Sequence, residues 1–202
     1  SLETFASILS NPNALEELHW LVLISGHLLC DGGVGEIPRI PSSVNILSKS
    51  CHSVEMDPVL SLCSTIFAII TYENEFLNAN KQISLSPLLA KTLVWFLNRW
   101  CKSYLLIDNN NYSPHILLSY GSDVHGGKGI HILDAMLRKI HINLHKWNAE
   151  FDVIKETLGL LTTLGDMKQV PAIIGTSMLP SWFDLLNTFA ASHPSISQLQ
   201  PV

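Results

Sequence analysis

The sequence is poor in charged residues. Asp, Glu, Lys and Arg make up 14% of its 202 residues, well below the roughly 25% usual in soluble domains. Hydrophobic residues make up 47%, which argues against disorder and suffices for one large core or a row of smaller stacked ones. The shortage of charge predicts that the rest of a longer chain covers part of the surface. The start at Ser1 and the finish at Val202 also suggest a piece of a longer chain.

Long hydrophobic runs and clusters of basic residues are also missing. The longest uncharged apolar stretch, Leu18 to Cys30, contains two histidines and is shorter than the roughly 20 residues that span a bilayer. The formal net charge is −5, and no basic patch is interleaved with aromatic residues, so attraction to nucleic-acid phosphates is not expected. We therefore predict neither membrane insertion nor nucleic-acid binding.

Motifs of metal, redox and nucleophilic chemistry are absent. No two cysteines form a C-x-x-C pair, which argues against a zinc ribbon or a thioredoxin-like motif. There is no G-x-S-x-G sequence, and the adjacency of Cys51 and His52 is uninformative because catalytic pairs meet in space. We predict that the chain is not an enzyme and assign no catalytic residue. Reduced, mostly buried thiols are expected at Cys30, Cys51, Cys63 and Cys101.

Helical periodicity is what the sequence does contain. In two segments, apolar residues recur every three or four positions, as in amphipathic helices. The first segment begins at Ser86 and Pro87, an N-cap and a first-turn proline, and ends at Asp108. The apolar stripes of the two segments are Leu89, Leu93, Phe96, Trp100, Tyr104 and Ile107, and then Ile130, Leu133, Leu137, Ile140, Leu144 and Trp147.

Four more helices are predicted from caps and apolar spacing. The first, from about Ala14 to Cys30 after an Asn13 cap, is apolar on most of its circumference, which predicts burial between neighbours. The others run from Asp57-Pro58 to about Asn78, from Asn148 to about Asp166, and from about Pro180 through Phe189.

No segment has convincing strand periodicity, so we predict an all-α fold. The helix starts do not repeat cleanly, but their spacing is compatible with the HEAT and armadillo period of roughly 40 to 47 residues. Residues 31–56, rich in glycine, proline and serine, are predicted to form a long loop, which favours an extended architecture. We therefore predict an α-solenoid of HEAT-like helix pairs, an α-α superhelix, with residues 1–202 as a single stretch from the middle of a longer chain.

A glycine-rich stretch from Gly121 to Gly129 has some likeness to a phosphate-binding loop, with residues 115–120 as a possible preceding strand. A P-loop needs Gly, four residues, then Gly-Lys and a hydroxyl side chain. Counted from Gly121, Lys128 comes one place late, and Gly129 replaces the hydroxyl residue. We interpret the stretch as a flexible connection into the next helix and predict no cofactor.

Histidines offer the best candidate metal site. His131, His141 and His145 share one side of the second helical segment with Asp134, and the spacing of the last two histidines suits two ligands of one ion. Arg138 projects from the same stripe, where it opposes a cation and can pair with Asp134. We interpret this stripe as a solvated helical face and predict no metal site.

Isolated histidines and tryptophans are interpreted as structural. His19 and His27 lie in an apolar helix, where a hydrogen-bonded core residue is expected. The tryptophans lie on or beside apolar stripes, so we interpret them first as core residues and second as anchors for a partner. They are Trp20, Trp95, Trp100, Trp147 and Trp182.

Two stretches carry a pattern more specific than periodicity. One is Leu18-His19-Trp20-Leu21-Val22-Leu23 followed by Gly26, Leu28-Leu29, Asp31, Gly35-Glu36, Pro38, Ile40 and Pro41. The other is Val94-Trp95-Phe96-Leu97-Asn98-Arg99-Trp100 through Tyr104-Leu105-Leu106. Both resemble the exportin-4 family of importin-β-type nuclear transport receptors, and the second has the family's form V-W-F-L-x-R-W. A weaker match covers Gly121 to Trp147, whereas residues 52–80 depart from the family pattern.

The resemblance implies a superhelix of HEAT repeats that binds Ran-GTP and carries cargo through nuclear pores. The implied cargo includes the hypusine-bearing translation factor 5A, with import of some transcription factors as well. The implied partners also include nuclear pore proteins, and the implied location is both nucleus and cytoplasm. Function in this family is spread over surfaces, so no residue is assigned to Ran or cargo. The alternative is a helical-repeat scaffold or interaction module outside nuclear transport, which the same periodicity permits.

Overall fold

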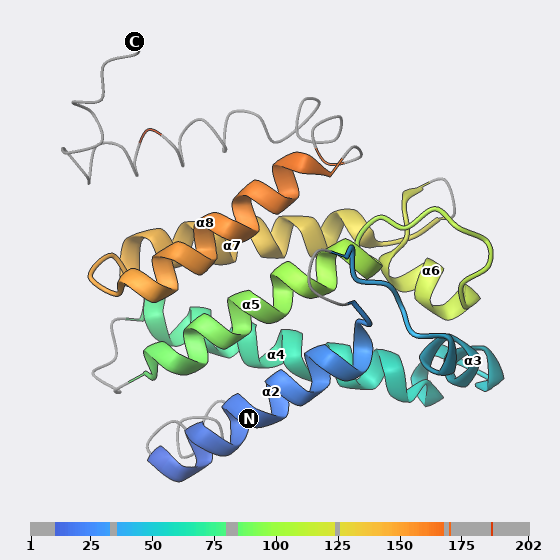
Figure 1. Ribbon diagram of the computed structural model, residues 1–202, viewed down its shortest axis with the longest axis horizontal. Helices are drawn as coiled ribbons and strands as arrows, with labels where there is room; N and C mark the ends of the chain where they lie inside the picture. The colour runs from blue at the N-terminus through green and yellow to red at the C-terminus, as the bar shows by residue number, and fades with distance from the viewer. Residues whose placement is uncertain are drawn as a thin grey trace.

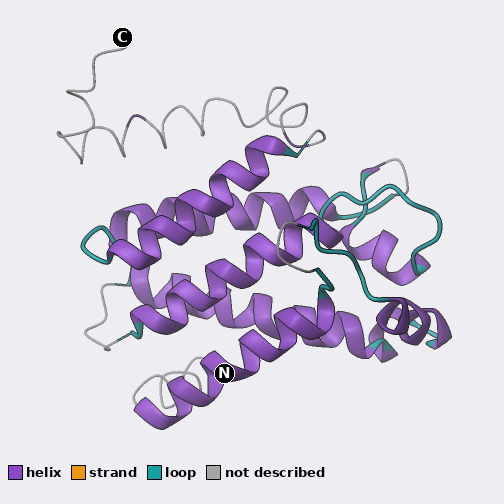
Figure 2. Ribbon diagram, in the orientation of Figure 1, coloured by secondary structure: helices purple, strands orange, loops and turns teal. Residues whose placement is uncertain are grey.

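The computed structural model describes residues 11–32, 36–79, 85–123, 126–167, 170 and 187. Within them it has seven α-helices, one short 3-10 helix and no strand, which confirms the predicted all-α fold (Figure 2). Among the described residues, every helix falls short of the length and hydrophobicity that a bilayer-spanning helix needs. The elements are α2 (Pro12–Leu29), α3 (Ser42–Ser50), η1 (Val54–Met56), α4 (Pro58–Asn78), α5 (Pro87–Tyr104), α6 (Pro114–Tyr120), α7 (Gly129–Lys146) and α8 (Phe151–Asp166).

The long helices form two layers, as an α-solenoid requires. Helices α2, α5 and α8 lie side by side in one layer, with α4 and α7 behind them and pointing the opposite way (Figure 1). Neighbours within a layer run parallel, because contacts advance together along both helices. The pairs that show this are His19–Thr92 and Gly26–Arg99 for α2 and α5, and Lys91–Asp152 and Thr163–Asn98 for α5 and α8.

A short helix interrupts each helix pair. The order long, short, long occurs in α2-α3-α4 and again in α5-α6-α7, and the two short helices contact each other at one end of the molecule (Figure 1). The predicted loop over residues 31–56 is therefore wrong for α3 and η1. Val44 and Ser48 are the buried residues of α3, and a serine-rich segment that buries so little gives no clear periodicity. The inserted helices also lengthen the repeat beyond the ordinary HEAT period.

The predicted helix ends are partly confirmed. Asp57 and Ser86 cap α4 and α5 through their side chains, as expected. Asn11 caps α2 in place of Asn13. The α5 helix ends at Tyr104 and not near Asp108, because the chain turns at Leu106, whose φ is 55°. Helix α8 begins at residue 151 and not at 148. The helix predicted over residues 180–189 lies outside the described residues, apart from residue 187, which is helical.

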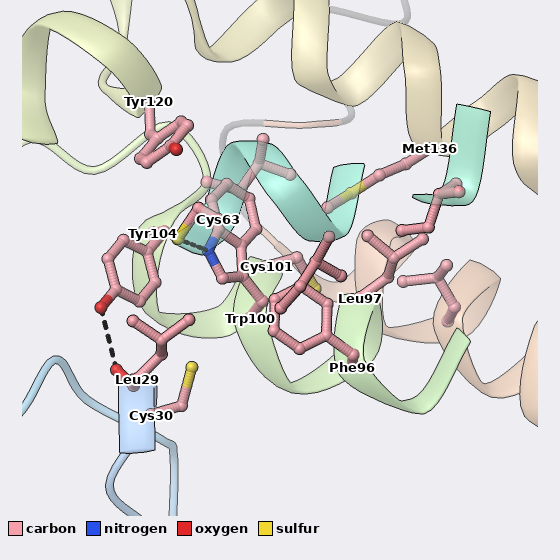
Figure 3. Close-up of a cluster of buried hydrophobic side chains, with 14 of the residues drawn as sticks. Leu29, Cys30, Cys63, Phe96, Leu97, Trp100, Cys101, Tyr104, Tyr120 and Met136 are labelled. Atoms are coloured by element: carbon pink, nitrogen blue, oxygen red, sulfur yellow. Dashed lines mark hydrogen bonds between the residues drawn. The ribbon is translucent and has the colours of Figure 1, made fainter. Parts of the chain in front are cut away.

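Helix α5 forms the centre of the core. The Trp100 ring stacks on Tyr104, with centroids 5.2 Å apart and planes at 5°, and meets Tyr120 edge-on at 4.8 Å (Figure 3). The Trp100 indole N–H points to the Cys63 sulfur at 3.4 Å. All four cysteines are free thiols and three are buried, as predicted, whereas Cys51 is half-buried.

Candidate protein-interaction site

The two stretches that carry the family pattern pack against each other as the joint between α2 and α5. Arg99 reaches from α5 to the end of α2, where helix carbonyls lack partners within the helix. Its Nη2 donates to the Cys30 carbonyl at 2.6 Å, and its Nε lies 3.1 Å from the same oxygen and 3.2 Å from the Gly26 carbonyl. The Tyr104 hydroxyl donates to the Leu29 carbonyl at 2.9 Å (Figure 3). Two motif side chains thus cap one helix.

Gly26 lets the two helices approach closely. A Cβ at this position would lie 2.6 Å from Trp95 Cζ3, which is nearer than real Cβ contacts come. Near the start of the same joint, His19 Nδ1 lies 2.6 Å from the Thr92 hydroxyl. The expectation of a hydrogen-bonded structural histidine is therefore confirmed for His19. The expectation of a core position is wrong for His27, which is exposed, with its ring 5.2 Å from that of Trp95.

A buried polar cluster ties the short helices together. Asp57 is fully buried and accepts a hydrogen bond from the Ser48 hydroxyl of α3 and from the Val59 N–H of its own helix. The Ser48 hydroxyl also lies 2.8 Å from the Ser113 hydroxyl, which caps α6. His115 Nδ1 lies 3.5 Å from the Asp57 carboxylate. One carboxylate therefore connects α3, α4 and α6, and this arrangement fixes the stacking of one repeat on the next.

A second buried polar contact joins α4 and α7, the two helices of the other layer. Lys139 of α7 donates to Glu73 of α4 at 2.6 Å, and both side chains are almost completely inaccessible to solvent. Such a pair contributes little net stability, but losing one member leaves an uncompensated buried charge. It therefore fixes the register between α4 and α7.

Beside this ion pair, α4 and α7 enclose a surface groove of about 440 Å³. Phe67, Ile70 and Met136 are among the apolar residues that line it, and Asn74 and Glu75 are among the polar ones. The carboxamide oxygen of Asn74 is buried and accepts no hydrogen bond in the structure. An apolar lining with polar groups beside it is a feature of protein-contact surfaces.

In the residues of the glycine-rich stretch that the structure describes, 121–123 and 126–129, the chain forms a packed connection between α6 and α7. Residues 115–120, considered as a strand, belong to helix α6. The backbone N–H groups of Gly127, Lys128 and Gly129 donate to the carbonyls of residues 122, 118 and 121, so these donors are not free for a phosphate. A Cβ on Gly127 would lie 2.3 Å from the Gly121 oxygen. These glycines permit close chain packing.

The histidine stripe on α7 has the predicted ion pair. Arg138 Nη2 lies 2.5 Å from the Asp134 carboxylate. The rings of His141 and His145 meet at 4.6 Å, and burial together with the neighbouring His145 lowers the pKa of His141. No group of three potential metal ligands occurs in the described part of the chain.

The tryptophans divide between core and surface. Trp100 and Trp147 are buried as predicted, and Trp95 is half-buried in the joint between α2 and α5. Trp20 departs from the expectation, because its side chain is 55% exposed. Trp182 lies outside the described residues.

Comparison with known proteins gives one consistent result. The family model described as Exportin-4 matches residues 1–200. Exportin-4 from Dictyostelium discoideum is 32% identical over 181 residues, which cover 86% of this chain. The same match covers only 16% of the relative, so the chain spans about one sixth of that protein's length.

Proposed function

Because the chain belongs to the exportin-4 family, we propose that it is part of a nuclear export receptor that binds cargo protein and Ran-GTP and carries the cargo through the nuclear pore. The match of the family model to nearly the whole chain supports this proposal most directly. The proposed partners include nuclear pore proteins and, as cargo, the hypusine-bearing translation factor 5A. A receptor of this kind shuttles between nucleus and cytoplasm and needs no catalytic residue.

The architecture supports a function based on binding. Parallel layers of stacked helices present an extended surface, whose curvature is the sum of small rotations between neighbouring repeats. The joints are closely packed, with Arg99 and Tyr104 holding the end of α2 and with Asp57 holding the short helices. In the proposed mechanism, Ran-GTP and cargo affect each other's affinity because each binds best at a particular curvature.

A binding experiment tests the proposal against a scaffold outside nuclear transport. The full-length protein is immobilised and incubated with Ran loaded with GTP or with GDP, in the presence and absence of hypusine-bearing factor 5A. We expect retention of the GTP form alone, and more of it when the cargo is present. Equal retention of both forms, or of neither, would favour the scaffold.

A further inference from the structure

The exposed apolar surfaces of α2 and of the groove between α4 and α7 differ in what could cover them. Only four of the 18 residues of α2 are buried, so the expectation that this helix is buried on most of its circumference is not met within the described residues. Helix α2 lies at one end of the row α2-α5-α8, where an added repeat would pack. The groove has both of its walls already in contact with each other, so an added repeat would lie beyond them and could not enter it.

The groove has the size of one short segment of another polypeptide. On the α4 wall it extends from Phe67 to Asn78, which is about 16 Å of helix. Ile132 and Met136 are among the residues of the α7 wall, and the fully buried Leu97 of α5 closes the base. The apolar lining therefore offers room for a few side chains that enter from outside the stack of repeats.

Hydrogen-bond acceptors gather on the C-terminal half of the α4 wall. The buried carboxamide oxygen of Asn74 accepts no hydrogen bond, and Glu75 adds a carboxylate beside it. Among the described lining residues the one cation is Arg138, which already pairs with Asp134. A buried acceptor without a donor is costly, so this end of the groove favours a ligand that donates hydrogen bonds and carries positive charge.

We propose that the groove binds a segment of a protein partner in which an arginine follows a large apolar side chain by about one helical turn. That spacing matches Ile70 and Asn74, which are four residues apart on α4. The guanidinium group donates to the Asn74 carboxamide oxygen and pairs with Glu75. The apolar side chain and the aliphatic part of the arginine pack on Phe67, Ile70 and Met136.

Arginine fits this site better than lysine does. Its planar group donates hydrogen bonds in several directions at once, so it can reach two neighbouring acceptors, and it is more weakly hydrated than an ammonium group. The proposal rests on the binding function proposed above, since it names the chemistry of a partner for this surface. It does not depend on Ran or on factor 5A.

Fluorescence anisotropy with the full-length protein, at an ionic strength of about 0.15 M, tests the proposal. The probe is a fluorescein-labelled, alanine-based helical peptide with one leucine and, four positions later, one arginine. Control peptides carry citrulline, which has almost the same shape without the charge, or lysine in place of the arginine. We expect the arginine peptide to bind about tenfold more tightly than the citrulline peptide, with the lysine peptide between them. An arginine peptide that fails to bind, or binds no more tightly than either control, would overturn the proposal.

Two variants test whether the peptide lies in the groove. Glu75→Gln alters an exposed side chain and should bring the affinity for the arginine peptide close to that for the citrulline peptide. Ala135→Phe fills the groove from the α7 wall and should abolish binding of every peptide. Glu16→Gln removes an exposed carboxylate from α2 and, as the matched control, should leave all affinities unchanged.

Circular dichroism checks that each variant is folded, and Glu75→Gln alone suffices if Ala135→Phe is not. Unchanged affinity for the arginine peptide in a folded groove variant, or an equal loss in Glu16→Gln, would contradict the assignment to the groove. Neither Ran nor factor 5A enters these measurements, so the site can be refuted while the proposed transport function stands.

Discussion

Replacing Lys139 by methionine should destabilise the protein strongly, because it leaves the Glu73 carboxylate buried without its partner. Lys139 and Glu73 are 0% and 3% exposed, and breaking such a pair costs about 3–5 kcal/mol. This is a large part of the roughly 5–15 kcal/mol that stabilises a typical domain. Urea unfolding followed by circular dichroism at 222 nm would measure the change.

Two further variants separate loss of charge compensation from loss of packing. In the double variant Glu73→Leu/Lys139→Met, both charges are gone and most of the stability should return, since apolar replacement of a buried pair is often neutral or stabilising. Lys91→Met breaks the exposed ion pair with Asp152 and should change stability little. The reasoning is refuted if Lys139→Met costs no more than Lys91→Met, or if the double variant is as unstable as the single one.

Three other outcomes are expected. Arg99→Ala should lower the free energy of unfolding by about 2 kcal/mol, because it removes charge-assisted hydrogen bonds to the end of α2, and Arg99→Lys should restore only part of this in urea titrations. Burial raises the pKa of the thiols of Cys30, Cys63 and Cys101 to about 11, 12 and 12. A thiol reagent at pH 8 should therefore modify these three slowly and the half-buried Cys51 quickly. A fast reaction of more than one of the four thiols would contradict the burial of the three. In an NMR titration, His141 should lose its proton at a lower pH than a free histidine, and His145→Asn should move that pH upward; no upward shift would mean that His145 is not a cause of the lowered pKa.

Helix starts and an ion pair within one helix could be predicted from the sequence, because both depend on residues that are close together in the chain. A capping side chain followed by proline marks the start of α4 at Asp57 and of α5 at Ser86, and both side chains accept hydrogen bonds from the first turn. The ion pair between Asp134 and Arg138 was likewise predicted, because residues four apart on a helix are neighbours.

Contacts between residues far apart in the sequence could not be predicted in this way, because no local pattern shows which segments meet. Lys139 adjoins Arg138 in the sequence, yet one is fully buried against a carboxylate 66 residues away and the other is exposed. Helix α3 was missed because its hydrogen-bonding partners, Asp57 and Ser113, belong to other elements. The groove between α4 and α7 left no sequence signal, since its apolar residues also fit an ordinary helix stripe.

The opposite directions of the two helix layers have an electrostatic consequence. Each helix carries roughly half a positive charge at its N-terminus and half a negative charge at its C-terminus. Parallel helices such as α2, α5 and α8 would therefore add up to a charge separation that grows with every repeat. Helices α4 and α7 point the other way (Figure 1) and offset it. A solenoid of this architecture can be lengthened without a growing field along its helices, which leaves side-chain charges to determine the potential at its surface.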